Sequence, residues 1–168
     1  MTVLFVTIAE PGHGKSFVAN QISNLCSAKH IRSDYIRKNR VADGDPVYSS
    51  DESQETYDIL FEEAEESLMN GNHVVLDATF NKKVGRERAH NISERTGAKV
   101  VFIRVECDSE TAKKRIRERE GISDADIEVY ENFRIEPIED RDTVTVDNSG
   151  SRDKTVRQVE SIVRESVN

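Results

Sequence analysis

Two glycines, a lysine and a serine are closely spaced near the start of the chain, within the stretch Ala-Glu-Pro-Gly-His-Gly-Lys-Ser. The pattern Gly-x-x-x-x-Gly-Lys-Ser/Thr is typical of loops that hold nucleotide phosphates, and this stretch departs from it only at Ala9. Gly12 and Gly14 would let successive backbone N–H groups turn toward phosphate oxygens. Lys15 would place a point charge on the β- and γ-phosphates of ATP, and the Ser16 hydroxyl would bind Mg²⁺. The residues therefore predict a site for ATP and Mg²⁺.

Three neighbours complete the description of this loop. Ala9 replaces the first glycine of the pattern, which costs little provided that its φ is negative. His13 lies inside the loop and could touch phosphate. Phe17 lies in the helix that should begin at Lys15, and the positive N-terminal end of that helix would face the phosphates. An ordinary glycine-rich turn is the alternative, but strand, loop and helix follow one another in the order that phosphate binding requires.

Asp34 and Arg37 come directly after the second predicted strand, on what we expect to be one or two helical turns. A carboxylate near the γ-phosphate could orient an acceptor hydroxyl and take its proton. Arg37 could then hold a second anion on the acceptor. In the alternative interpretation Asp34 is a helix N-cap and Arg37 is its solvated neighbour. The spacing alone leaves both interpretations open.

Asp77 ends the apolar run Val-Val-Leu of the third predicted strand. A carboxylate at this position, beside a phosphate loop in a parallel sheet, is typical of a residue that helps to hold Mg²⁺ directly or through water. Thr79 and Asn81 follow on the loop and could contact the acceptor or water bound to Mg²⁺. Local hydrogen bonding within the turn explains these two residues equally well.

Arg115 and Arg119 are one helical turn apart, so they share a face of a predicted basic helix. They precede a polar stretch in which a lid, covering about residues 115–137, could hinge. Two guanidinium groups closing on a transferring phosphoryl group would neutralise charge and exclude water. A solvated basic helix surface is the alternative for this helix.

Strands and helices alternate along the chain, which predicts a doubly wound parallel sheet covered by helices on both faces. Ligands of such sheets bind at the carboxyl ends of the strands, where the predicted phosphate loop already lies. We expect a single domain over residues 1–168. The predicted strands span 3–8, 30–33, 73–77, 99–105 and 143–146, and the predicted helices span 15–28, 51–69, 82–96, 109–119, 124–133 and 151–167.

Several helix ends are marked in the sequence. Ser50 or Asp51 is a good N-cap for the long helix that runs to Met69, and Ser109 is a good N-cap for the basic helix. Gly97 is expected to end the helix that precedes the fourth strand.

The composition is typical of a soluble globular protein, with 168 residues, a hydrophobic fraction of 36% and a net charge of −8. This acidity argues against a protein that coats nucleic acid nonspecifically. The apolar runs are too short for a transmembrane helix, and the first strand follows Met1 without a secretory leader, so we expect a cytoplasmic protein without a membrane partner. Cys26 and Cys107 have no disulfide or metal-ligand spacing and are expected to be buried thiols. The four histidines lack the pairing of a zinc site.

The chain resembles the P-loop kinases of the AAA_33 type, which are related to polynucleotide 5′-hydroxyl kinase and to zeta-toxin-like kinases. The resemblance rests on the motifs A-E-P-G-H-G-K-S, S-D-Y-I-R, V-V-L-D-A-T-F-N, K-R-I-R-E-R and I-S-D-A-D, and it extends from residue 3 to about residue 150. It implies the three-layer α/β/α fold of P-loop nucleotide kinases, with a five-stranded parallel sheet and a small helical lid. The resemblance does not extend to a phosphatase or ligase partner domain.

On the ATP side, the resemblance implies that Lys15 and Ser16 bind ATP phosphates and Mg²⁺. Arg115 and Arg119 match lid arginines, and Arg119 is the better match to the one that stabilises the transferred phosphoryl group. Asn148 lies in a turn that matches the segment holding adenine by backbone contacts.

On the acceptor side, Asp34 matches the general base, Arg37 matches an arginine that contacts acceptor phosphate, and Asp77 matches a residue that positions Mg²⁺ or the acceptor. Two acceptor classes stay open. A polynucleotide 5′-hydroxyl is favoured by Asp34 with Arg37 and by clustered basic residues. A small molecule such as a nucleoside, sugar or antibiotic is favoured by the net acidity and the lack of an exposed aromatic platform. A non-catalytic ATP-binding switch is a third hypothesis.

Overall fold

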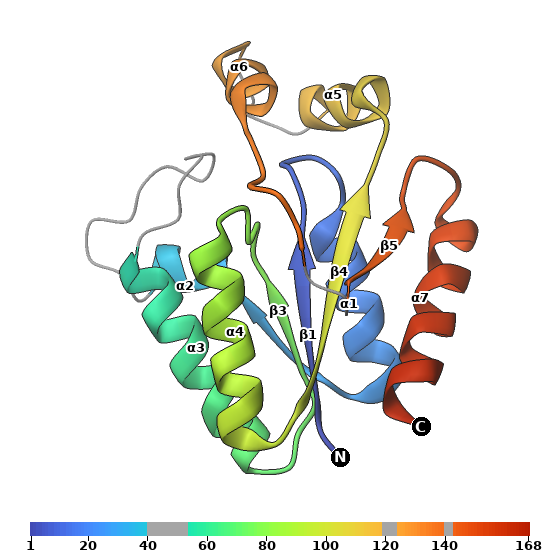
Figure 1. Cartoon of the computed structure of the whole chain (residues 1–168). Coiled ribbons are helices and arrows are strands. Elements are labelled where there is room, and N and C mark those ends of the chain that lie inside the picture. Colours follow the sequence, from blue (N-terminus) through green and yellow to red (C-terminus); the bar gives the residue numbers. More distant parts are fainter. Residues whose placement is uncertain (40–53, 119–123, 140–142) are drawn as a thin grey trace.

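The computed structural model describes residues 1–39, 54–118, 124–139 and 143–168. Within these residues the chain forms a parallel sheet of five strands in the order β2-β3-β1-β4-β5. The predicted doubly wound α/β/α architecture is therefore confirmed (Figure 1). The strands are β1 (Val3–Ile8), β2 (Lys29–Arg32), β3 (Val74–Asp77), β4 (Lys99–Glu106) and β5 (Thr143–Asp147).

Helices cover both faces of the sheet, with α3 and α4 on one face and α1 and α7 on the other (Figure 1). Two further helices, α5 and α6, lie beyond the carboxyl ends of the strands, while both chain termini lie at the opposite end. The helices are α1 (Lys15–Cys26), α2 (Ser33–Asn39), α3 (Gln54–Met69), α4 (Lys83–Thr96), α5 (Ser109–Arg117), α6 (Asp124–Asn132) and α7 (Arg152–Val167).

The central strand β1 is buried on both faces. Leu4, Val6 and Ile8 join the core that the sheet shares with α3 and α4. Val3 and Phe5 point the other way and join the core shared with α1 and α7. Successive side chains of a strand point to opposite faces, so a strand covered on both sides reads as a continuous apolar run. This packing places the loop after β1 at the middle of the sheet's carboxyl edge.

One predicted N-cap differs from the structure. The N-cap of α5 is Asp108 and not Ser109, because the Asp108 carboxylate accepts a backbone N–H hydrogen bond of 2.8 Å inside the first turn. Gly97 ends α4 with a φ of +73°, as predicted. The predicted N-cap at Ser50 or Asp51 lies outside the described residues.

Among the described residues, no helix combines the length and the apolar character needed to cross a membrane. Cys26 and Cys107 are both free thiols. Each is half-buried, so the expectation of buried thiols was wrong in degree.

Candidate functional site

The loop between β1 and α1 has a left-handed backbone at both glycines, with φ of +81° at Gly12 and +90° at Gly14. Space is also short at both positions. A Cβ on Gly12 would lie 2.8 Å from Ile116 Cγ1 of α5, and a Cβ on Gly14 would overlap the amide nitrogen of Asn148. The two glycines are therefore required both by the turn of the loop and by what packs against it.

Two further residues predicted for this loop are Ala9 and Phe17. Ala9 is buried, does not have a positive φ, and donates its backbone N–H to the Thr79 carbonyl at 3.1 Å. The condition under which alanine is tolerated there is met. Phe17 lies in the first turn of α1, and the guanidinium carbon of Arg152 stands 5.4 Å from its ring centroid. This contact joins the start of α1 to the start of α7.

Asn148, directly after β5, holds the phosphate loop in place through hydrogen bonds. Its Nδ2 donates to the His13 carbonyl at 2.8 Å, and its Oδ1 accepts a hydrogen bond of 2.8 Å from the Thr155 hydroxyl. Its backbone N–H donates to the Glu106 carbonyl at 2.7 Å. All of these groups hold Asn148 in one orientation, so its side chain fixes the shape of the loop.

Asp77 is buried at the end of β3 and is surrounded by Lys15, His30 and Arg32. Lys15 Nζ lies 3.6 Å from Oδ1, while His30 Nε2 lies 2.8 Å and Arg32 Nε 3.8 Å from Oδ2. Burial would raise the pKa of this carboxyl, but the hydrogen bond from His30 and the charge of Lys15 outweigh it and bring the pKa below its ordinary value. Asp77 is therefore a carboxylate at neutral pH.

The surroundings of Asp77 fit a divalent cation shared with a nucleotide. Its Oδ1 is buried without a hydrogen-bond partner, and the Ser16 hydroxyl lies beside the same carboxyl. In the described part of the chain, no group of three or more His, Cys, Asp or Glu side chains could hold a metal. Mg²⁺ binds through few carboxylates together with water and phosphate oxygens. Ser16 and Asp77 would thus supply the protein's share of such a site.

Arg32 links this carboxylate to the predicted general base. Its Nη2 lies 3.1 Å from Asp34 Oδ2, and its Nε faces Asp77. The other oxygen of Asp34 accepts the Tyr35 backbone N–H at 2.8 Å. Asp34 lies in the first turn of α2 and is partly exposed, whereas Arg37 is only 5% exposed. The alternative interpretation of Arg37 as a solvated side chain is therefore wrong.

Thr79 and Asn81 lie on the turn between β3 and α4. The Thr79 hydroxyl donates to Asn81 Oδ1 at 3.2 Å, so the two residues do bond locally within the turn. The Asn81 carbonyl accepts the Glu136 backbone N–H at 2.8 Å. The segment 134–137, which follows α6 and is called the strap below, is thereby joined to this turn.

Arg86 strengthens the same junction from inside the protein. This side chain is 2% exposed and belongs to α4. Its Nη1 donates to the Phe80 carbonyl at 2.8 Å, and its Nη2 donates to the carbonyls of Glu136 and Pro137 at 3.1 and 2.9 Å. Phe80 has a φ of +45°, an uncommon value for a bulky residue. The buried guanidinium thus holds both the strap and a strained turn.

Of the two lid arginines, the structure describes one. Arg115 donates to Cys107 Sγ at 3.4 Å, and its Nη1 lies 3.9 Å from where a Cβ on Gly14 would stand. Arg115 is therefore beside the phosphate loop. Arg119 and residues 119–123 of the predicted lid lie outside the described residues.

His13 connects the phosphate loop with α6. Its Nε2 is 3.0 Å from the Tyr130 hydroxyl, and its Nδ1 is 3.2 Å from Glu10 Oε2 without hydrogen-bond geometry. Glu10 is held by Arg104 of β4 through two contacts of 2.8 Å. Burial lowers the pKa of His13, although the nearby Glu10 carboxylate opposes this shift. The imidazole predicted to touch phosphate thus contacts Tyr130 of α6.

We expect the free energy of unfolding to fall as the pH is lowered from about 6.5, the ordinary pKa of an unfolded histidine. The folded protein resists protonation of His13 because its pKa is lowered, so the unfolded chain binds the extra proton. The effect is complete once the pH has fallen below the folded pKa. Urea unfolding at pH 7.5 and 5.5 should show a smaller pH effect for His13→Gln. An equal change in the free energy of unfolding between the two pH values in both proteins would contradict this prediction.

Sequence reasoning missed several residues that organise the site. His30 and Arg32 carried a usable signal, because polar residues two apart on a strand share one face. The sequence carries no such signal for Arg86 or for the side chain of Asn148, since their hydrogen-bond partners are distant in the sequence.

Comparisons with known proteins identify the family and the fold of this chain. Residues 4–134, more than half of the chain, match the AAA_33 family, an AAA domain. A candidate kinase from Chloroflexus aurantiacus J-10-fl shares the fold with a TM-score of 0.79, at 17% identity over 99% of each chain. A comparison with curated proteins gives no match.

Two further solved structures share the fold. A gluconokinase from Sinorhizobium meliloti 1021 has a TM-score of 0.69 at 19% identity, over 98% of this chain and 93% of that one. The APS kinase CysC of Mycobacterium tuberculosis, solved with AMPPNP and APS, has a TM-score of 0.69 at 15% identity over 98% of each chain. At these identities the likeness is one of fold.

Proposed function

Because the chain belongs to the AAA_33 family of AAA domains, we propose that it is a kinase that transfers the γ-phosphoryl group of ATP to an acceptor hydroxyl. The observation that carries the proposal is the convergence of Lys15, Asp77 and Asp34 at the carboxyl edge of the sheet. Arg32 lies between the two carboxylates, and Lys15 Nζ lies 3.6 Å from Asp77 Oδ1. The parts that phosphoryl transfer needs are thus adjacent.

Each residue has a role in this proposal. The backbone of Gly12 and Gly14 and the Lys15 ammonium bind the β- and γ-phosphates, while Ser16 and Asp77 hold Mg²⁺. Mg²⁺ would neutralise charge on the two phosphates when bound. Asp34 takes the proton from the acceptor hydroxyl. The oxygen of that hydroxyl then bonds to the γ-phosphorus, and the bond from the γ-phosphorus to the oxygen that bridges it to the β-phosphate breaks. The products are the phosphorylated acceptor and ADP.

The lid belongs to the same proposal. Arg115 lies beside the phosphate loop and would neutralise charge on the transferred group, with Arg119 as a second arginine. We assign residues 1–168 to one kinase domain, in which about 115–137 form the lid. The backbone of the turn at Asn148 would contact adenine.

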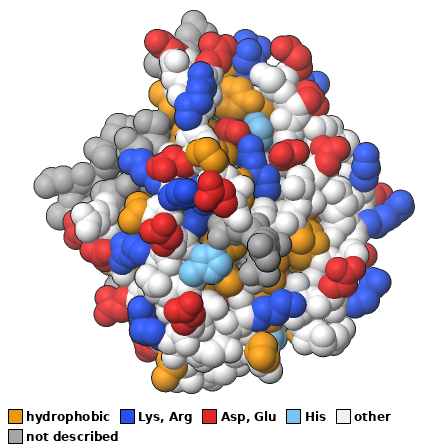
Figure 2. All heavy atoms as spheres, in the orientation of Figure 1, with side chains coloured by type: hydrophobic (Ala, Val, Ile, Leu, Met, Phe, Trp, Pro, Cys, Tyr) orange, Lys and Arg blue, Asp and Glu red, His pale blue; other side chains and the backbone are white. Residues whose placement is uncertain are grey.

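Two acceptor classes fit the proposal. A small molecule is supported by the fold likeness to a gluconokinase and to an APS kinase solved with APS. The surface adds to this, because basic and acidic side chains alternate over the face drawn in Figure 2. A polynucleotide 5′-hydroxyl is supported by the pair of Asp34 and Arg37, since a buried arginine suits an acceptor phosphate.

Salt dependence should separate the two acceptor classes. For a small acceptor, we expect kcat/KM to change by only a few-fold between 50 and 200 mM KCl, whereas several phosphate contacts to a polymer would cost about 10³-fold or more. The measurement is transfer from γ-labelled ATP to each acceptor across this range. A steep loss of kcat/KM with an oligonucleotide as the salt concentration rises, together with no transfer to small hydroxyl compounds, would favour the polynucleotide hypothesis.

A further inference from the structure

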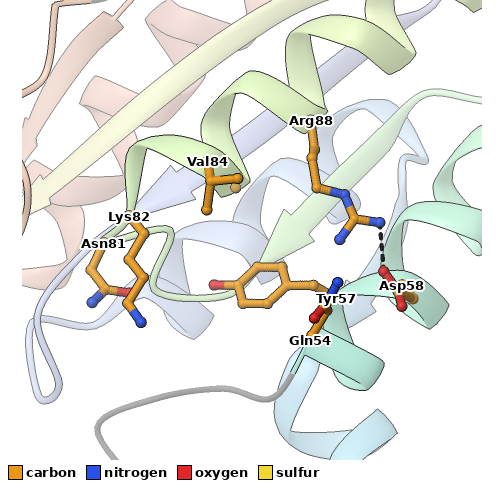
Figure 3. A pocket seen from close by; sticks show the side chains of 8 residues that line it. Gln54, Tyr57, Asp58, Asn81, Lys82, Val84 and Arg88 are labelled. Carbon is orange, nitrogen blue, oxygen red and sulfur yellow. Dashed lines mark ion pairs between the residues drawn. The ribbon is translucent and has the colours of Figure 1, made fainter.

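A cavity of about 510 Å³ lies between the N-terminal ends of α3 and α4, with the turn after β3 as its third wall (Figure 3). This turn follows Asp77, and its Thr79 carbonyl accepts the backbone N–H of Ala9 at the start of the phosphate loop. Figure 3 shows Tyr57 extending from α3 toward Asn81 and Lys82, while Arg88 reaches in from α4 farther along the cavity. The lining residues are Gln54, Tyr57, Asp58, Asn81, Lys82, Val84, Gly85 and Arg88.

The walls of this cavity are held by packing and hydrogen bonds. The Tyr57 ring stacks with Phe61 at a centroid distance of 6.0 Å and meets Phe80 edge-on at 5.4 Å. Asn81 is fixed through its carbonyl to the strap at Glu136. A ligand would therefore meet side chains that are already ordered, which reduces the entropy cost of binding.

The charges of the lining favour an anion. Arg88 Nη2 lies 2.7 Å from Asp58 Oδ1, and the guanidinium carbon of Arg88 stands 4.7 Å from the Phe61 ring centroid. A guanidinium has five N–H donors in a planar fork, so this contact leaves donors directed elsewhere. Lys82 is a second cation, and Asp58 is the one acid among the described lining residues.

We propose that this cavity binds the acceptor, and that the acceptor is a small hydroxylated anion carrying a carboxylate or a phosphate monoester. The proposal rests on the kinase function proposed above. The anionic group lies at Arg88, while the hydroxyl end lies near Asn81 and the turn from Asp77. The amides of Gln54 and Asn81 provide partners for further hydroxyl groups. The volume falls within the range of about 300–1,000 Å³ that is usual for small-molecule sites.

Matched pairs of compounds test the charge preference directly. The probes are D-gluconate against D-sorbitol for the carboxylate, and D-glucose 6-phosphate against D-glucose for the phosphate. Both transfer from γ-labelled ATP and equilibrium binding in the presence of AMPPNP are measured. We expect the anion of at least one pair to bind about 10-fold or more tightly than its neutral partner, as for a lost hydrogen bond to a charged group.

Substitutions in α4 test whether Arg88 is the source of the preference for an anion. Arg88→Gln should remove the advantage of the anion, chiefly through KM, and Arg88→Lys should restore part of it. Arg95→Gln is the matched control, because Arg95 also pairs an α4 guanidinium with an α3 carboxylate, that of Glu65, but lies away from the cavity. We expect this control to keep the preference and all three variants to bind ATP as the wild type does.

The outcomes separate the cavity from the kinase activity. Anion-selective binding without phosphoryl transfer would refute the kinase function and leave the cavity assignment standing. Transfer that ignores charge, failure of every anion to bind at millimolar concentration, or equal effects of the two Gln variants would overturn the assignment. Transfer to a 5′-hydroxyl oligonucleotide alone would overturn it as well.

Discussion

Lys15→Ala is expected to lower the rate of phosphoryl transfer by about 10²–10³-fold, the loss typical of removing one preorganised group that stabilises transition-state charge. Lys15 begins α1, and its ammonium stands 3.6 Å from Asp77 Oδ1, where the γ-phosphate and Mg²⁺ are expected. The shortened side chain also leaves Asp77 with less positive charge nearby. ATP affinity should therefore fall together with the rate.

The measurement is transfer from γ-labelled ATP, with ATP binding followed by thermal shift. Lys99→Ala is the matched control, because Lys99 is exposed and begins β4, at the end of that strand opposite the site. Wild-type transfer by Lys15→Ala would remove the phosphate loop from the mechanism. Equal losses in both variants would indicate a general effect on folding.

Asp34→Asn is expected to lower transfer by about 10²–10⁴-fold, the usual contribution of a general base. Asparagine keeps an oxygen that can accept the Tyr35 N–H, which Asp34 now holds at 2.8 Å, so α2 should keep its start. The amide cannot take a proton from the acceptor. ATP binding should be unchanged, because among the described residues Asp34 contacts Arg32 and the Tyr35 backbone rather than the phosphate loop.

This substitution also separates an enzyme from a non-catalytic ATP-binding switch. A switch would bind ATP equally well in both proteins and would transfer phosphate in neither. Asp153→Asn is the matched control, since Asp153 is likewise the acid in the first turn of a helix, α7. Full activity of Asp34→Asn alongside an active wild type would show that another group takes the proton.

The fold could be predicted from the sequence to a large extent because its strands are buried on both faces. Such strands are continuous apolar runs, and the predicted and observed bounds of β1 agree at residues 3–8. Helix ends were less certain where two capping residues are adjacent, as Asp108 and Ser109 are. A single sequence offers no rule for which of two neighbouring oxygens reaches a free N–H.

The site could be predicted only where a local motif carries it. Gly14, Lys15 and Ser16 belong to one short pattern, so their positions followed from it. The surroundings of Asp77 depend instead on the register of β2 against β3, which pairs Arg32 with Asp77 and His30 with Val75. Register between parallel strands that are distant in the sequence is set by packing of the whole sheet.

The hydrogen bond from Asn148 to the His13 carbonyl spans 135 residues, and it has a consequence for the order in which the protein matures. During synthesis the phosphate-loop sequence emerges first, yet the side chain that fixes its shape arrives with β5 and α7. Domains fold as units as the chain leaves the ribosome, and contacts between distant residues form late. A nascent chain would therefore become able to hold ATP only after its final strand and helix had joined the sheet.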